Sequence, residues 1–322
     1  MRRWLVVTRS GEVVKLDGGR DLEGCAVSPR GTRAILYGTR VDHRLILSSS
    51  GLQARSIFES GHRALVRSPL VLAMRCHPQW SCDETRLAYG TSRFEDGRVG
   101  ESFYLEIHNL LDRSLRSIAS HAVQCVQWVP DDRAVMTVES SPRGVSVLTY
   151  PLDGITTVKF WTPPLDASAG GFSIAPDGSA IAYHADTSDE GGPKDHAFIH
   201  NATAREGTPV GPIEPFTQPR WSPLSSRLAF LMNDRGAVSL TVFDRSVQES
   251  KVIAVVNRGD ATREAPPPSP VWLPDGRSLV FSSFEREGSL IALADLDSGT
   301  VETLVRADAR VLSLSLLLAT AQ

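Results

Sequence analysis

Short runs of apolar residues, separated by polar turns, recur along the whole chain. The clearest unit spans 271–281, where Val271-Trp272 is followed by a Leu-Pro-Asp-Gly turn and by a second apolar run that ends at Phe281. Close copies span 172–183 and 220–230, and looser copies span 26–37, 79–89 and 127–137. Short apolar runs bounded by turn residues are typical of β-strands. Each copy therefore predicts a strand, a tight turn and a second strand.

One turn position, which we call the anchor, is nearly constant among the six units. The anchors are Pro29, Cys82, Pro130, Pro176, Pro223 and Pro274, and they lie 53, 48, 46, 47 and 51 residues apart. Proline presets the backbone φ angle for such a turn, and a Gly after an Asp, as at Asp177-Gly178, relieves the steric cost of a positive φ. A large apolar residue precedes each anchor by two positions: Val27, Trp80, Trp128, Ile174, Trp221 or Trp272.

A second predicted hairpin with a polar turn follows each unit. Residues 104–112 and 114–119 form one such hairpin, and residues 239–244 and 250–255 form another. Helical periodicity is nearly absent from the chain. Each repeat therefore predicts four antiparallel strands, which is the composition of one β-propeller blade.

The Trp-x-Pro-Asp-Gly-Arg-x-Leu-x-Phe pattern at 272–281 resembles the TolB-like, WD40-like propeller repeat. The resemblance covers most of the chain and is weakest in the first two copies, at Arg30-Gly31 and at 81–84, where the Asp-Gly pair is incomplete. It implies an all-β propeller fold. Its recurrent residues are turn and packing residues, so the repeat itself carries no chemistry.

Seven second hairpins accompany the six units, because an extra hairpin opens the chain at 4–8 and 12–16. Beyond the sixth repeat, residues 309–318 form another apolar run. We therefore expect one propeller domain over 1–322, in which the N-terminal hairpin 1–17 and a C-terminal strand within 306–322 share a seventh blade. Such a blade closes the ring and protects its open strand edges. A six-bladed ring with terminal extensions is the alternative.

Charge and composition exclude several classes of protein. The 34 Lys and Arg residues nearly balance the 37 Asp and Glu residues, which argues against binding to nucleic acid. The apolar run at 4–7 is shorter than the core of a signal peptide, and no stretch is long enough to span a bilayer. The four cysteines are too few for a disulfide framework. We expect a monomeric, cytoplasmic protein without membrane insertion; a periplasmic or secreted location would require a leader that was removed.

Polar residues on the predicted innermost strands are the first candidates for chemistry, because those strands line the channel of a propeller. They are Arg75, His77, Gln124, Gln127 and Arg220. The two arginines could bind a carboxylate or phosphate, and His77 could act as a general acid or base. Gln124 and Gln127, together with Glu101 from a nearby loop, are candidate ligand-binding residues. Alternatively, these groups bond only to backbone carbonyls and channel water.

Two predicted loops between second and third strands, 91–102 and 186–196, are long and charged. Long loops are often functional, although insertions on a surface are also tolerated. His184, Asp186 and His196 could together hold a divalent metal such as Zn²⁺ or Mn²⁺. No recognised ligand spacing supports this set, and acidic loop residues are usually solvated. We therefore predict no cofactor, with a divalent metal at these residues as the alternative.

Catalytic motifs are missing from the sequence. It contains no G-x-S-x-G nucleophile elbow, no phosphate-binding glycine loop, no H-E-x-x-H pair and no Cys-x-x-Cys pair. Together with the resemblance, this predicts a non-catalytic propeller that binds a protein or peptide partner at the channel mouth. The alternatives are an enzyme (a lyase, hydrolase or cyclase) that acts on a small polar substrate in the central channel, and a sensor that binds a small polar ligand without turnover.

Overall fold

The structure is a computed structural model of the 322-residue chain. It describes residues 4–7, 13–16, 22–29, 33–38, 45–48, 51–56, 73–74, 76, 78–94, 101–154, 158–161, 170–186, 195–204, 206–214, 217–234, 237–256, 268–285 and 288–308. Every regular element in these residues is a β-strand, so the predicted all-β class is confirmed. The same residues include no helix that could cross a membrane.

The chain divides into two compact units. The first comprises residues 1–6, 14–160 and 315–322, and the second comprises residues 7–13 and 161–314. Each is built of antiparallel sheets of the kind that the repeat predicts, and each is described by itself below.

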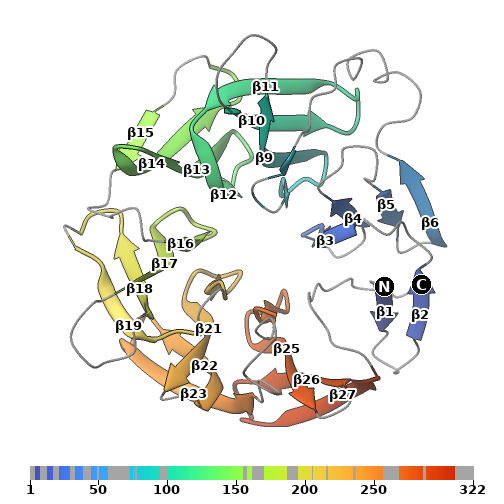
Figure 1. The fold of residues 1–322 in the computed structure, drawn as a ribbon, viewed down its shortest axis with the longest axis vertical. Helices are drawn as coiled ribbons and strands as arrows, with labels where there is room; N and C mark the ends of the chain where they lie inside the picture. The colour runs from blue at the N-terminus through green and yellow to red at the C-terminus, as the bar shows by residue number, and fades with distance from the viewer. Residues whose placement is uncertain are drawn as a thin grey trace. The chain divides into compact units, whose positions relative to one another are not determined.

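Among the described residues of the first unit, three sheets have consecutive strands side by side (Figure 1). The first sheet has the order β3 (Leu22–Val27), β4 (Arg33–Gly38), β5 (Leu45–Ser48), β6 (Gly51–Ser56). In the second, β9 (Arg86–Phe94), β10 (Glu101–Asn109) and β11 (Leu115–Ser120) follow two short strands, β7 (Ala73–Met74) and β8 (Gln79–Trp80), that both pair with β9. The third has the order β12 (Ala122–Trp128), β13 (Ala134–Ser141), β14 (Gly144–Pro151), β15 (Val158–Trp161), of which only Trp161 belongs to the second unit.

The second unit holds three further sheets of four strands among its described residues. Their orders are β16 (Gly170–Ile174), β17 (Ala180–Asp186), β18 (Asp195–Asn201), β19 (Thr208–Pro212); β20 (Arg220–Trp221), β21 (Arg227–Asp234), β22 (Ala237–Asp244), β23 (Glu249–Val256); and β24 (Val271–Trp272), β25 (Ser278–Glu285), β26 (Gly288–Asp295), β27 (Val301–Ala307). Each of these six sheets thus consists of one anchor unit and the hairpin that follows it.

The extra N-terminal hairpin is also present, as β1 (Trp4–Val7) paired with β2 (Val13–Leu16). The predicted C-terminal run at 309–318 lies outside the described residues, so the seventh blade built from both termini stays a prediction.

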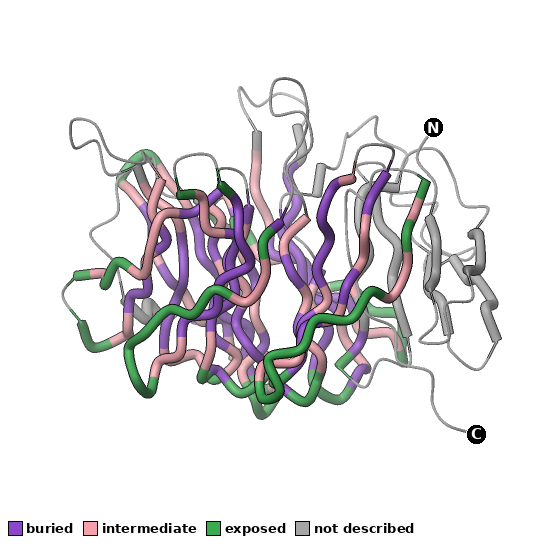
Figure 2. The backbone as a smooth tube through the Cα atoms, turned by 90° about the horizontal axis from the view of Figure 1, so that it is seen from below, coloured by how far each residue is buried: buried purple, intermediate pink, exposed green. Residues whose placement is uncertain are grey.

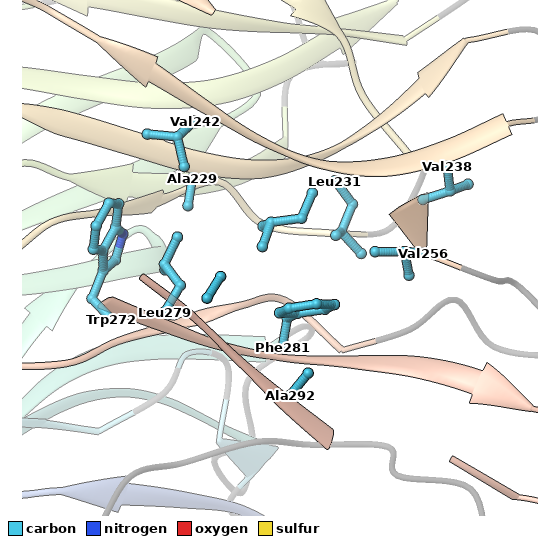
Figure 3. Packing of buried hydrophobic residues seen from close by; sticks show 11 residues of the cluster. Ala229, Leu231, Val238, Val242, Val256, Trp272, Leu279, Phe281 and Ala292 are labelled. Atoms are coloured by element: carbon cyan, nitrogen blue, oxygen red, sulfur yellow. The ribbon is translucent and has the colours of Figure 1, made fainter. Parts of the chain in front are cut away.

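Neighbouring sheets within each unit pack through apolar faces. In the second unit, Leu231 and Leu240 of one sheet meet Trp272 and Phe281 of the next in a core of buried side chains (Figure 3). In the first unit, Leu105 and Val126 belong to a similar core. Buried stretches consequently alternate with exposed turns along the chain (Figure 2).

The tryptophan before the anchor adds a hydrogen bond to this packing. The indole Nε1–H of Trp80 donates to the carbonyl oxygen of Ala26, at 2.9 Å, in the preceding sheet. Trp128, Trp221 and Trp272 make the same bond to Gln79, Ser173 and Arg220, at 3.0, 3.0 and 2.8 Å. All four acceptors stand three residues before the anchor of their own repeat. The indole bond is therefore a repeated feature that fixes the distance from one first strand to the next.

The anchor turn adopts the same backbone in each described copy from the second onward. The residue two positions after the anchor has a positive φ: Glu84, Asp132, Gly178, Ser225 and Gly276. A side chain in this conformation costs about 1–2 kcal/mol relative to the usual α region. Two of the non-glycine residues bond to the preceding sheet, because the Asp132 carboxylate accepts the N–H groups of Cys82 and Asp83 and the Ser225 hydroxyl accepts the N–H of Asp177.

This geometry predicts an unusual order of stability at position 132. Asp132→Ala removes both bonds to the preceding sheet and keeps a side chain at a φ of 56°, whereas Asp132→Gly removes the bonds but relieves the strain. We expect the glycine variant to be more stable than the alanine variant by about 1 kcal/mol, with wild type the most stable. Urea unfolding of the purified variants measures this order.

The neighbouring Asp131 is the matched control, because its φ is not among the positive ones. There the order should reverse, since glycine at an ordinary φ is less stable than alanine. An alanine variant at 132 that equals the glycine variant would contradict the strain argument.

Candidate functional site

The structure describes three of the candidate residues on the first strands in full. Gln124 and Gln127 lie on β12 in the first unit, and Arg220 begins β20 in the second unit. Arg75 and His77 lie outside the described residues. Glu101 begins β10 opposite Phe94, and its side chain lies outside the described part of the structure. A joint site of Arg75, His77 and Arg220 therefore stays a prediction.

Gln124 stands at a β-bulge. Val123 pairs with Glu139 and Cys125 pairs with Val138, so Gln124 is the extra residue of β12. Its side chain is exposed, and its Nε2 donates to the hydroxyl of Ser140 at 2.9 Å. The bulge thereby presents an amide group to solvent at the end of the sheet where β13 and β14 are joined.

Irregularity at this point recurs in other first strands. The register also shifts between Leu22 and Gly24 in β3 and between Gly170 and Ser173 in β16. In the second sheet, the first strand is interrupted between β7 and β8. β-bulges often adjoin functional sites because they redirect a side chain out of the regular alternation. The candidate residue Gln124 is at one of these irregular points.

Gln127 and Arg220 are less accessible than Gln124. Gln127 is half-buried, and its Nε2 donates to the Trp128 carbonyl oxygen at 3.1 Å. Arg220 is also half-buried, and its carbonyl oxygen accepts the indole N–H of Trp272. Both positions thus take part in hydrogen bonds of the first strands.

A buried carboxylate supports the strand that carries Gln124. Glu139 on β13 is only 1% exposed. Its Oε1 accepts the hydroxyls of Tyr150 and Thr137 at 2.6 and 2.8 Å, and its Oε2 accepts the N–H of His121 at 2.9 Å. Burial, together with this carboxylate, raises the pKa of Tyr150, which keeps its proton for the bond. The network ties the start of β12 to β13.

Sequence reasoning missed Glu139, although a signal is present. It is a glutamate that directly follows the apolar run 134–138 of a predicted strand. A charged residue there requires buried partners, which the hydroxyls of Thr137 and Tyr150 provide.

The metal candidates do not all lie on one face of their sheet. His184 pairs with Ala197, and His196 pairs with Ala185. Because directly paired residues point to the same side and neighbours alternate, His184 and His196 lie on opposite faces. The register therefore does not bring the two imidazoles to one face, and the side chain of Asp186 lies outside the described part of the structure. The carboxylate near His184 is instead that of Asp195, whose Oδ1 lies 3.9 Å from His184 Nδ1.

Ionisation in this region follows burial. Desolvation lowers the pKa of His184, against the opposing effect of the Asp195 carboxylate, so the imidazole is neutral at neutral pH. Burial raises the pKa of the Cys76 thiol to about 12, and its Sγ accepts the N–H of Gly90 at 3.0 Å. Cys76 is consequently a protonated packing residue at neutral pH rather than a nucleophile.

Comparisons of sequence give no family for the chain. No family model matches it, and no curated protein matches it significantly.

Comparisons of structure define the fold. The chain resembles TolB from Acinetobacter baumannii, with 16% identity and a TM-score of 0.51 over 88% of this chain and 64% of that one. It also resembles an oligogalacturonate lyase in complex with manganese, with 17% identity and a TM-score of 0.64 over 89% and 81% of the two chains. A chain of the mitotic checkpoint complex gives 14% identity and a TM-score of 0.57 over 91% and 82%.

These likenesses establish a β-propeller. More closely, the chain has the fold of the TolB-like, WD40-like propellers, as the repeat at 272–281 predicts. The chain spans about 64% of the length of the TolB chain. At these identities the likeness concerns the fold alone, and solved propellers that resemble this chain include an enzyme as well as TolB.

The Glu139 network generates a prediction. Glu139→Gln replaces one of the two accepting oxygens by an N–H₂ group, which faces either the main-chain N–H of His121 or the two hydroxyls that donate in wild type. At least one of these bonds is lost or must reverse its direction, so we expect a loss of about 2–4 kcal/mol of stability. Tyr150→Phe removes one of three bonds and should cost about 1–2 kcal/mol. Chemical unfolding measures both. The exposed Glu302 of β27 is the control, and Glu302→Gln should change stability by less than about 0.5 kcal/mol. A Glu139→Gln variant as stable as wild type would refute the support role.

Proposed function

We propose that the chain is a non-catalytic, TolB-like propeller that binds a protein or peptide partner at the channel mouth, the end of the sheets that carries the loops between second and third strands. The observation that carries this proposal is the pair of amides on β12, Gln124 and Gln127, with Gln124 exposed at its bulge. The fold shared with TolB and with a chain of the mitotic checkpoint complex is compatible with it.

The chemistry of the amide favours a peptide over a reacting substrate. An amide side chain offers both a donor and an acceptor, which is what a peptide bond offers in return. It has no pKa that could be tuned for proton transfer, so it binds rather than catalyses.

The position of β12 supports the same proposal. β12 stands at the end of the strand order of its sheet, and an extended peptide can add main-chain bonds to such a strand. Gln124, Gln127 and the first strand that bears them would then select the peptide by its polar side chains. We also propose that the protein acts as a cytoplasmic monomer without a cofactor.

Selection of peptides tests the proposal directly. A phage-displayed random peptide library is selected on the immobilised full-length protein, and the Kd of each enriched synthetic peptide is measured by calorimetry. We expect a micromolar Kd that Gln124→Ala weakens about tenfold, since one lost hydrogen bond at about 1.4 kcal/mol changes Kd by that factor. Gln127→Ala should weaken binding to a smaller extent, because its amide is half-buried.

Arg133→Ala is the matched control, because Arg133 is exposed in the anchor turn of the same sheet, away from Gln124. Its Kd should equal that of wild type. A library that yields no peptide of micromolar Kd, or peptides whose binding depends on Arg133 and not on Gln124, would defeat the proposal.

An enzyme acting on a small polar substrate is the second candidate. The TM-score of 0.64 to an oligogalacturonate lyase exceeds that to TolB, 0.51, and this favours testing it. In this case Arg75, His77 and Arg220 would bind or activate an anionic sugar, with Mn²⁺ present in the assay. Incubation with oligogalacturonate, followed by ultraviolet absorbance of the unsaturated product, decides it. Turnover that His77→Ala abolishes would replace the binding proposal.

A further inference from the structure

The side-chain amide of Gln124 is held in one orientation near the start of β12. Its Nε2 donates to the Ser140 hydroxyl at 2.9 Å and to the Ala122 carbonyl oxygen at 3.4 Å. A main-chain carbonyl oxygen can only accept a hydrogen bond, so the nitrogen of the amide, and not its oxygen, must face Ala122. Together the two contacts use both N–H bonds of the amide.

The oxygen of this amide is the atom that remains for a ligand. Gln124 is exposed, and none of the described groups donates to its Oε1. A carbonyl oxygen has lone pairs and no proton, so it bonds to a hydrogen-bond donor and cannot bond to a carboxylate or a phosphate. A glutamine amide can in general donate and accept, but here its donors are already used. Gln124 therefore selects a donor.

Ser140 keeps the amide in this orientation. Ala122 and Ser140 are paired across β12 and β13. The Ser140 hydroxyl donates to the Ala122 carbonyl oxygen at 3.5 Å, so it presents a lone pair to the amide nitrogen of Gln124. Ser140 is thus a positioning residue, which acts on a ligand through Gln124.

A buried negative charge lies at the same end of the sheet. The carboxylate of Glu139 accepts from two hydroxyls and from the main-chain N–H of His121, and none of these donors carries a charge. Neutral donors stabilise a carboxylate but leave its net charge in place. Because Glu139 is only 1% exposed, salt screens this charge less than it screens the charge of a surface carboxylate.

This charge acts close to the amide of Gln124. Glu139 bonds to the N–H of His121, and Gln124 bonds to the carbonyl oxygen of the next residue, Ala122. Glu139 is enclosed by the protein, so it acts on a ligand only through its charge. Arg143, in the adjoining turn, carries the opposite charge but is exposed, where solvent and salt weaken its effect. The electrostatic field at Gln124 therefore favours a positive group.

We propose that the peptide partner places a cationic donor, an ammonium or a guanidinium group, against Oε1 of Gln124, which Ser140 positions. Both groups consist of donors alone, and both carry the charge that the buried carboxylate of Glu139 attracts. This inference rests on the proposed function and adds the chemical class of the group that the β12 site selects. The same site discriminates against a peptide that presents an aspartate or a glutamate at this point.

Neutral replacements in the selected peptides test the inference. In each enriched synthetic peptide, every lysine is replaced in turn by norleucine, every arginine by citrulline, and the terminal ammonium is acetylated. Calorimetry on the full-length protein gives the Kd of each. We expect one replacement to raise the Kd for wild type about tenfold, because it removes a charge-assisted hydrogen bond. For Gln124→Ala the same replacement should raise the Kd less than about threefold, because the acceptor is missing.

Ser140→Ala tests the positioning role. Without the hydroxyl the amide can turn over, so the ratio of Kd values between the neutral and the cationic peptide should fall from about ten to about three. Ser141→Ala is the matched control, because the Ser141 hydroxyl donates within its own turn, to the Gly144 carbonyl oxygen. Its ratio should equal that of wild type. Circular dichroism establishes that each variant is folded.

The possible outcomes separate this inference from the proposed function. A library without any micromolar peptide would defeat peptide binding and the cationic donor together. Peptides that bind through Gln124 but are insensitive to every neutral replacement would overturn the cationic donor alone. A cationic group that contributes equally to binding by wild type and by Gln124→Ala would do the same. A ratio of Kd values that Ser140→Ala leaves unchanged would overturn the positioning role.

Discussion

The hydrogen bond from each tryptophan to the preceding first strand is the interaction on which the arrangement within each unit depends. A sheet packed only through apolar side chains can slide on its neighbour, because dispersion and hydrophobic burial are not directional. The indole N–H is directional, and its acceptor stands at the same repeat position in all four described copies, three residues before the anchor. Two arginines reinforce it, since the Arg86 and Arg245 guanidinium groups lie over the rings of Trp128 and Trp221 at 5.9 and 5.3 Å. Arg245 also donates to Ser179 and Asn201 of the preceding sheet.

At the end of the sheets that carries the anchor turns, polar groups are used in hydrogen bonds within the protein. The anchor turns of Asp132 and Ser225 accept main-chain N–H groups from the turn before, so their polar side chains are already used. The opposite end carries the hairpins between second and third strands, where lengths and charges differ from copy to copy. Gln124 and the His184–Asp195 pair both lie at that end of their own sheets. The positions that repeat from copy to copy thus form the scaffold, and the positions that differ between copies hold the candidate functional residues.

Most of the fold follows from the sequence because turns and apolar runs are local signals. The expected strands at 239–244 and 250–255 appear as β22 and β23 with ends shifted by one or two residues. The face on which a side chain lies and the register between two strands are harder to predict, because both depend on the number of residues in the intervening loop. His184 and His196 are twelve positions apart, an even spacing that would share a face along one strand, yet pairing of His184 with Ala197 puts them on opposite faces. Asp195 was assigned to the predicted loop 186–196, whereas it begins β18. Its approach to His184 was therefore not predicted. The bulge at Gln124 likewise has no local signature.

Buried polar groups differ in whether the protein alone satisfies them, and this separates structural groups from binding groups. The Glu139 carboxylate receives three donors, and the Glu214 carboxylate receives the amide of Asn233 at 2.7 Å. Such carboxylates have little to gain from a ligand, because their desolvation is already offset by protein donors. The His184 imidazole faces the Asp195 carboxylate at 3.9 Å, and its Nδ1 has no hydrogen-bond partner among the described groups, so this contact is not satisfied in the same way. The amide nitrogen of Gln124 donates to Ser140 and to Ala122, and the exposed side chain remains open to solvent. On a scaffold built from repeated turns, a candidate site is therefore recognised by polar groups at the variable end of the sheets that the protein itself does not fully hydrogen-bond.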